Sequence, residues 1–165
     1  FERAYRKVKG LSSSDPITQD YILSITELNM SGRGLSDITD IAMFKNLTNL
    51  NLSGNSFSNL TPLSGLKKLK VLQLSNSTKI TSISALSSLT NLTELQLSGD
   101  NILDVSPLSG LTKLTKLYLD KNKISNVTPL MSLKSLTKLS IKNNNVSEED
   151  IAALRAALPN CSITA

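Results

Sequence analysis

Short alternations of apolar and polar residues recur along most of the chain. In each, a central leucine sits between two polar or small residues, and a second apolar residue follows two positions later. An alternation with a period of two is typical of a short β-strand. The central leucines are Leu28, Leu50, Leu72, Leu95, Leu117 and Leu139, spaced 22, 22, 23, 22 and 22 residues apart. Self-similarity at a fixed period of this size predicts a solenoid of six repeats.

The fourth repeat shows the full pattern. Residues 92–102 read L-x-x-L-x-L-x-x-D-x-I, and residues 105–111 read V-S-P-L-x-x-L. Strands separated by about one such repeat can all run in one direction, so we expect a parallel sheet with the return path of each repeat on its other side. Pro62, Pro107 and Pro129 favour a 3-10-like or extended return, because proline fixes φ and lacks an N–H donor. Burial of the inward leucines, at roughly 1.5–3 kcal/mol per side chain, holds the stack together.

The repeats differ at two places after the strand. The ninth position of the motif is asparagine in three repeats, and the others have Arg33, Ser77 and Asp100. The third repeat has one extra residue, which predicts a bulged loop around residues 75–79.

Both ends of the chain have helical patterns. Residues 1–10 have the apolar spacing of a short amphipathic helix, with Phe1, Ala4, Tyr5 and Val8 on one face and Gly10 at its end. Thr18 is placed to cap a second short helix. Residues 147–158 predict a third helix with Ser147 as N-cap and Pro159 beyond its end, followed by a half-strand at residues 161–163.

These patterns divide the chain into an N-terminal helical cap (1–24), six repeats (25–146) and a C-terminal helix with a closing half-strand (147–165). We expect this to be a single domain and a complete capped stack. The first residue is not methionine, which suggests a fragment or a processed chain.

The repeat signature resembles that of leucine-rich repeat proteins of the 22-residue class, which include the bacterial internalins and their secreted or surface-attached relatives. The resemblance implies an α/β solenoid, a right-handed coil with a parallel sheet on its concave face, a 3-10 or irregular convex side, and helical caps at both ends. It also implies that the ninth-position asparagines, Asn55, Asn122 and Asn144, bond backbone groups at the turn after the strand. Internalin-like proteins bind partners through the concave face.

The residue inventory argues against catalysis. The chain has no histidine, which excludes the Ser-His-Asp and Cys-His arrangements, and its single Cys161 cannot form an internal disulfide. The aspartate pairs Asp37 with Asp40 and Asp100 with Asp104 lie in loops without accompanying pocket residues. No apolar run approaches the roughly 20 residues that a membrane-spanning helix needs. We therefore expect no enzyme activity, cofactor, metal site or membrane insertion.

Charge is unevenly distributed over the repeats. Residues 91–112 contain three acidic and no basic residues, whereas residues 113–145 contain seven lysines against Asp120. Apart from Glu27, the outward positions next to the central leucines are small and neutral in the first three repeats, and they are varied in the last three. We predict a partner-binding patch where the acidic fourth repeat meets the basic fifth, formed by Glu94, Gln96, Lys116, Tyr118, Asp120, Lys138 and Lys142.

Two classes of function fit these features. The first is a non-catalytic recognition module of a bacterial secreted or cell-surface protein, a monomer that binds a protein or glycan on its concave face. The alternative is an intracellular regulatory scaffold similar to the leucine-rich phosphatase regulators, which share the 22-residue period. The lysine excess is also compatible with an anionic partner, but nucleic-acid readers interleave basic residues with stacking aromatics, and the patch has only Tyr118.

Overall fold

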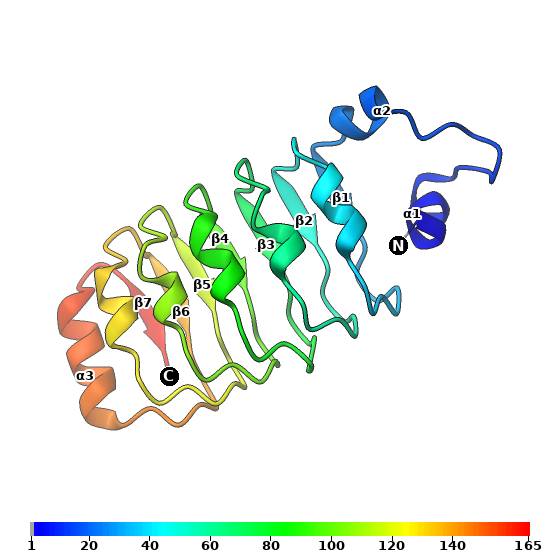
Figure 1. The fold of residues 1–165 in the computed structure, drawn as a ribbon. Coiled ribbons are helices and arrows are strands. Elements are labelled where there is room, and N and C mark those ends of the chain that lie inside the picture. Colours follow the sequence, from blue (N-terminus) through cyan, green and yellow to red (C-terminus); the bar gives the residue numbers. More distant parts are fainter. Residues whose placement is uncertain (1) are drawn as a thin grey trace.

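Seven short strands form one parallel sheet in the order of the sequence (Figure 1). The structure is a computed structural model that describes residues 2–165. The strands are β1 (Glu27–Asn29), β2 (Asn49–Asn51), β3 (Val71–Gln73), β4 (Glu94–Gln96), β5 (Lys116–Tyr118), β6 (Lys138–Ser140) and β7 (Ser162–Thr164). The central leucines pair in register from Leu28 to Leu139, and Ile163 continues the row in β7. The predicted strands and their parallel stacking are confirmed.

The return path of each of the first five repeats contains a short 3-10 helix on the side away from the sheet (Figure 1). These are η1 (Thr39–Met43), η2 (Thr61–Leu63), η3 (Ser84–Ser88), η4 (Ser106–Leu108) and η5 (Thr128–Ser132). Proline lies in the first turn of η2, η4 and η5, as predicted. Leucines from the strands and the 3-10 helices fill the space between the two sides, and Leu95 and Leu108 are fully buried there. The predicted leucine-rich repeat solenoid is therefore confirmed.

One residue per repeat turns the chain after the strand, and it always lies four positions beyond the central leucine. All six have positive φ, between 56° and 77°: Gly32, Gly54, Asn76, Gly99, Lys121 and Asn143. The extra residue of the third repeat follows this position, in a turn that the Ile80 N–H closes on the Ser77 carbonyl. The predicted bulged loop is thus confirmed.

Helices α1 (Glu2–Lys9) and α2 (Gln19–Ser24) cap the N-terminal end of the stack. As predicted, α1 is followed by Gly10 with φ of 67°, and the Thr18 hydroxyl accepts a hydrogen bond from the Tyr21 N–H. Phe1, which we expected on the apolar face of α1, lies outside the described residues. The Tyr5 ring packs at 5.2 Å from the Phe44 ring, and its burial raises the pKa of Tyr5 to about 12.

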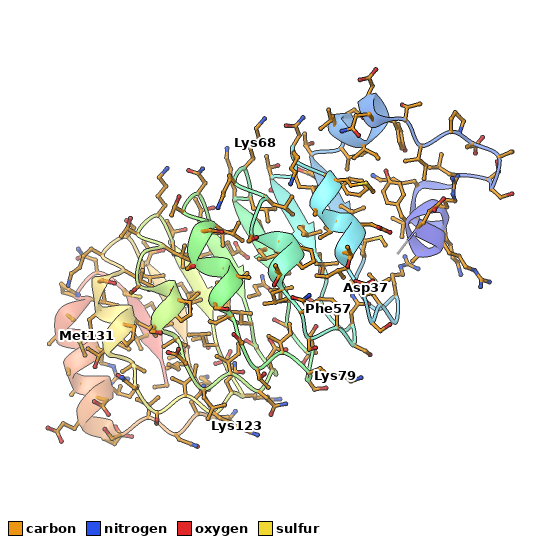
Figure 2. The ribbon with its side chains drawn as sticks, viewed as in Figure 1. Asp37, Phe57, Lys68, Lys79, Lys123 and Met131 are labelled. Carbon is orange, nitrogen blue, oxygen red and sulfur yellow. The ribbon has the colours of Figure 1, made fainter. Side chains whose placement is uncertain are left out.

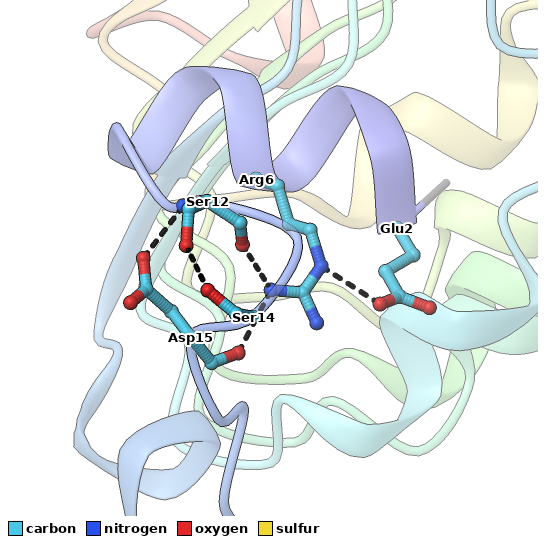
Figure 3. Close-up of polar contacts among 5 residues, drawn as sticks. All are labelled: Glu2, Arg6, Ser12, Ser14 and Asp15. Atoms are coloured by element: carbon cyan, nitrogen blue, oxygen red, sulfur yellow. Dashed lines mark hydrogen bonds and ion pairs between the residues drawn. The ribbon is translucent and has the colours of Figure 1, made fainter.

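Arg6 ties α1 to the segment that follows it (Figure 3). Its Nε donates to Glu2 at 2.8 Å, and its Nη1 donates to the backbone carbonyls of Ser12 and Asp15. The Asp15 carboxylate in turn accepts from the Ser12 N–H at 2.6 Å. Hydrogen bonds from Ser12 lower the pKa of Asp15, so its carboxyl group is ionised at neutral pH. The segment between the two helices is thus held by hydrogen bonds to charged groups.

Helix α3 (Glu148–Ala157) covers the last repeat at the C-terminal end (Figure 1). The Ser147 hydroxyl accepts from the Asp150 N–H, so Ser147 is the N-cap that the sequence predicts. Ile151 and Leu154 are buried against the stack. Strand β7 then pairs with β6 along the edge that would otherwise remain open.

Candidate functional site

The outward residues of the strands form regular rows across the open face of the sheet. Residues that flank the central leucine in one strand lie beside their equivalents in the next, at the strand spacing of about 4.8 Å. The seven residues of the predicted patch come from β4, β5, β6 and the positions just beyond β5 and β6. The structure therefore brings all seven to one region of this face.

Glu94, Gln96 and Lys116 form a connected polar group. Lys116 Nζ lies 3.5 Å from a Glu94 carboxylate oxygen, and Gln96 Nε2 donates to the other oxygen at 2.8 Å. The Lys116 side chain is about half exposed, so the ion pair is a solvent-screened contact that contributes little to stability. Its two charges offset each other, which leaves Lys138 and Lys142 as the unpaired cations of the patch.

Tyr118 and Lys138 make the most specific contact on the face. The ammonium nitrogen of Lys138 lies 5.3 Å from the centroid of the Tyr118 ring, within the range of a cation–π interaction. Tyr118 is partly exposed and stands in register between Gln96 and Ser140. A large ring held by its neighbours loses little conformational entropy on binding, so Tyr118 is suited to anchor a partner.

Asp120 has a structural role that the sequence did not predict. One of its carboxylate oxygens accepts from the Ser140 hydroxyl at 2.7 Å and from the Lys142 N–H at 2.8 Å. The Thr164 and Ser140 hydroxyls are 3.0 Å apart, which extends the network to β7. Asp120 therefore ties the fifth repeat to the sixth and fixes the backbone of Lys142 within the patch.

The N-terminal half of the face contains a feature that the repeats do not reveal. Strands β1 to β3 and the end of α1 enclose a shallow hollow of about 450 Å³. Its floor is rich in carboxamides, including Asn49, Asn51 and Gln73, and Val8 and Lys9 of α1 form one side. Nothing in the sequence pattern indicates that α1 borders this hollow, because the position of α1 beside the sheet is set by tertiary packing.

The three ninth-position asparagines bond backbone groups at the turn after the strand, in their own repeat and in the preceding one, as the resemblance implies. The amide nitrogen of Asn55 donates to the carbonyls of Met30 and Leu52, and its amide oxygen accepts from two N–H groups of the preceding turn. The amide nitrogens of Asn122 and Asn144 likewise donate to two such carbonyls each, and their oxygens accept from the N–H groups of Ile102 and Ile124.

Asp100 occupies the same position but is a buried acid. Its Oδ1 accepts from the Ser77 N–H at 2.7 Å, whereas Oδ2 is buried with no hydrogen-bond partner among residues 2–165. Burial raises the pKa of Asp100 to about 7, against the smaller lowering effect of the Ser77 N–H. Asp100 is therefore not a surface charge at the boundary between the fourth and fifth repeats, which makes the outer surface of the fourth repeat less acidic than its sequence suggests.

The other candidate groups for chemistry serve local structure. Asp37 and Asp104 accept hydrogen bonds from Thr39 and Ser106 at the starts of η1 and η4, and these bonds lower the pKa of both carboxyls. Cys161 packs partly buried in the closing turn, and burial raises its pKa. Within residues 2–165, no three acidic or cysteine side chains gather closely enough to hold a metal ion. No helix in this range is both long and apolar enough to cross a bilayer.

Comparisons with known proteins agree on one family. A family model described as leucine-rich repeats (two copies) matches residues 45–88, 67–111 and 112–156. The crystal structure of an internalin (inlF) from Listeria monocytogenes is similar with a TM-score of 0.77 and 33% identity, over 98% of this chain and 54% of its own length. An internalin C2 (inlC2) from the same strain gives 0.51 and 28%, over 98% and 90%. The chain thus spans about half the length of the first of these structures. A search of curated protein sequences found no match.

Proposed function

The chain belongs to the leucine-rich repeat family and is internalin-like, and from this premise we propose that it is a non-catalytic module that binds a protein partner through the open face of its sheet. The observation that carries the proposal is the pairing of Tyr118 with Lys138, beside the Glu94–Lys116 ion pair. It places an aromatic anchor and charges of both signs on adjacent strands. Such a combination gives contact area and selectivity together.

The patch residues have distinct roles in this proposal. The Tyr118 ring contributes more binding free energy than any other residue of the patch, because it buries apolar surface against the partner. Lys138 and Lys142 select a partner with an acidic surface and accelerate its association, while Glu94 and Gln96 fix its orientation. Asp120 holds Ser140 and the Lys142 backbone in place and contacts the partner only at the margin.

We also propose that the chain acts as a monomer and belongs to a secreted or cell-surface bacterial protein. Both solved structures reported above are Listeria internalins, which supports this setting over the intracellular regulatory scaffold. We expect no catalytic turnover from the purified chain.

The test is a binding screen of the purified chain against an array of extracellular protein domains, followed by affinity measurements on the variants Tyr118→Ala and Lys138→Glu. We expect Tyr118→Ala to weaken binding about tenfold or more, which corresponds to about 1.4 kcal/mol. We expect Lys138→Glu to slow association and to reduce its salt dependence.

Two matched variants distinguish a loss of contacts in the patch from effects of altered folding or net charge. Tyr118→Phe keeps the ring and should retain most of the affinity, and Lys79→Glu makes the same charge reversal in an exposed loop away from the face. Partners that bind both Tyr118→Ala and Lys138→Glu at full strength would place the binding surface elsewhere.

A further inference from the structure

The loops that lead into strands β2 to β7 carry only positive charge. These loops span residues 44–48, 64–70, 88–93, 109–115, 132–137 and 157–161, and none of them contains an acidic residue. Their lysines, which we call the basic rim, are Lys45, Lys67, Lys68, Lys70, Lys113 and Lys134. All six lysines are exposed. Because the strands are parallel and in register, these loops lie side by side at the end of the sheet where the strands begin, and they form one long edge of the stack.

The opposite edge has charges of both signs. Its loops contain Asp37, Asp104 and Asp120 together with Lys79 and Lys123. Figure 2 shows Lys68 at the upper edge of the stack, and Lys79 and Lys123 at the lower edge. The excess positive charge of the repeats is therefore concentrated on one edge.

An asparagine holds Lys68 in a defined position. Asn46 Nδ2 donates to the Leu23 carbonyl at 2.7 Å, and Asn46 Oδ1 accepts from Lys68 Nζ at 2.7 Å. The Asn46 carboxamide is thus fixed to the backbone of helix α2 and presents its oxygen to Lys68 in the next loop of the rim. Such a contact orients the ammonium group without neutralising it.

The same arrangement occurs a second time along the rim. Asn91 Nδ2 donates to the Lys67 carbonyl at 2.9 Å, and Asn91 Oδ1 accepts from Lys113 Nζ at 2.7 Å. Lys67 and Lys134 donate to backbone carbonyls of the adjacent loops. Among residues 2–165, the ion pairs within 4 Å are Arg6 with Glu2 and Lys116 with Glu94, so the rim lysines keep their full charge.

Between the two asparagines the rim is hollowed. A shallow groove of about 420 Å³ is lined by Thr48, Lys68, Lys70, Asn91, Thr93 and Lys113. Three ammonium groups therefore surround a surface that is mostly apolar, where the Thr48 and Thr93 hydroxyls donate to the backbone carbonyls of Thr26 and Lys70. The lysine stems add apolar surface to the groove.

We propose that the basic rim binds a linear sulfated polysaccharide, with sulfate groups on Lys68, Lys70 and Lys113. Sugar hydroxyls donate to the oxygens of the Thr48 and Thr93 hydroxyls, whose own protons are directed to backbone carbonyls. The lysines of the loops before β2, β3, β5 and β6 lie along one side of the stack, and this row suits an extended chain that carries anions along its length. Neutralising them releases counterions from the polymer, which drives binding strongly at low salt.

The composition of the rim argues for a glycan over other polyanions. Single-stranded nucleic acids need aromatic side chains for base stacking, and none of the six loops exposes an aromatic residue. Protein interfaces are depleted in lysine and depend on aromatic and arginine anchors, which these loops also lack. A flexible sulfated chain needs neither, because its anions match the ammonium donors and its hydroxyls match the threonine oxygens as acceptors.

The test uses heparin oligosaccharides as the probe and measures their affinity for the whole chain by titration calorimetry between about 50 and 200 mM salt. The rim variant replaces Lys68, Lys70 and Lys113 by Gln, and the control variant replaces Lys79, Lys121 and Lys123 by Gln. Both variants lose the same charge, and their thermal unfolding is measured to confirm that they fold. We expect the rim variant to bind at least tenfold more weakly and to lose about 2 from the slope of log K against log salt, while the control retains most of its affinity.

Several results would overturn the proposal. These are no binding of heparin at the lowest salt, an equal loss of affinity in both triple variants, or equally tight binding of desulfated heparin, a thymidine oligonucleotide or polyglutamate. The rim is distinct from the Tyr118 patch, so we expect Tyr118→Ala to leave heparin binding unchanged. The rim and patch proposals can therefore fail independently.

Discussion

Asp100 takes the position in the fourth repeat that asparagine holds in the second, fifth and sixth. At Asn55 and Asn122 the amide nitrogen donates to two backbone carbonyls. An ionised carboxylate has no proton to donate, so only protonated Asp100 can replace one of these bonds. With 5% of its surface exposed, the group favours the neutral form, which is why its pKa rises to about 7.

The raised pKa makes the stability of the chain depend on pH. Between about pH 4 and pH 7 the folded state holds a proton on Asp100 that the unfolded chain has lost, so this group favours folding less and less as pH rises through that range. We expect Asp100→Asn to raise the free energy of unfolding at about pH 8 by about 2 kcal/mol, a value that allows for solvent screening. Urea denaturation should show the gain shrinking as pH falls toward 4.

Asp104→Asn is the matched control in the same repeat. Hydrogen bonds from Ser106 lower the pKa of Asp104, so its ionised form stabilises the fold above the ordinary carboxyl pKa and loses that effect as pH falls. The variant should therefore be less stable than the parent at neutral pH, with a difference that vanishes in acid. A gain for Asp100→Asn that is independent of pH would contradict the titration of Asp100.

At the scale of elements, short side chains begin most of the helical turns. Asp37, Asn59, Asp104 and Asn126 accept an N–H two residues later at the starts of η1, η2, η4 and η5. Such bonds satisfy donors that a helix start leaves without partners. One aspartate of each pair in the sequence, Asp37 and Asp104, thus begins a turn, a role shared with asparagine and independent of acid–base chemistry.

Helix α3 offers a direct test of capping. Ser147→Ala removes the acceptor for the Asp150 N–H, and we expect it to lower the free energy of unfolding by about 1 kcal/mol. Thermal denaturation of this variant should be compared with Ser135→Ala, at an exposed position in the loop before β6. Equal stability of the two variants would mean that α3 does not depend on its cap.

At the scale of the whole molecule, stability comes from contacts between neighbouring repeats. Within residues 2–165 each strand pairs with the strands directly before and after it, and the central leucines of neighbouring strands lie in register within one hydrophobic core. The helical caps and β7 close the ends of the stack. Loss of packing in the middle therefore weakens both halves at once.

Leu95→Ala tests this in the central strand. Leu95 is fully buried, so we expect a loss of about 2–5 kcal/mol in the free energy of unfolding, with faster hydrogen exchange in β3 and β5 as well as in β4. Leu103→Ala changes the same side chain in the same repeat at a site that is 59% exposed, and should stay within about 0.5 kcal/mol of the parent. Exchange that rises in β4 alone would contradict the nearest-neighbour stack.

The sequence by itself determined the solenoid, its six strands, its turns and its helical caps. These features depend on local patterns, such as a leucine every 22 or 23 residues or a serine before an acidic turn. The patterns recur in successive repeats, so each repeat supports the same interpretation. It also predicted the Tyr118 patch as a set of outward positions.

Only the tertiary structure decided how side chains from different repeats meet. Lys138 lies over Tyr118, Lys68 is held by Asn46, and α1 stands beside the sheet. Asp100 is buried, although its neighbours in sequence are polar. Each of these depends on a rotamer or a packing distance between residues about 20 or more positions apart, and a periodic pattern does not specify such contacts because it constrains backbone register and not side-chain placement.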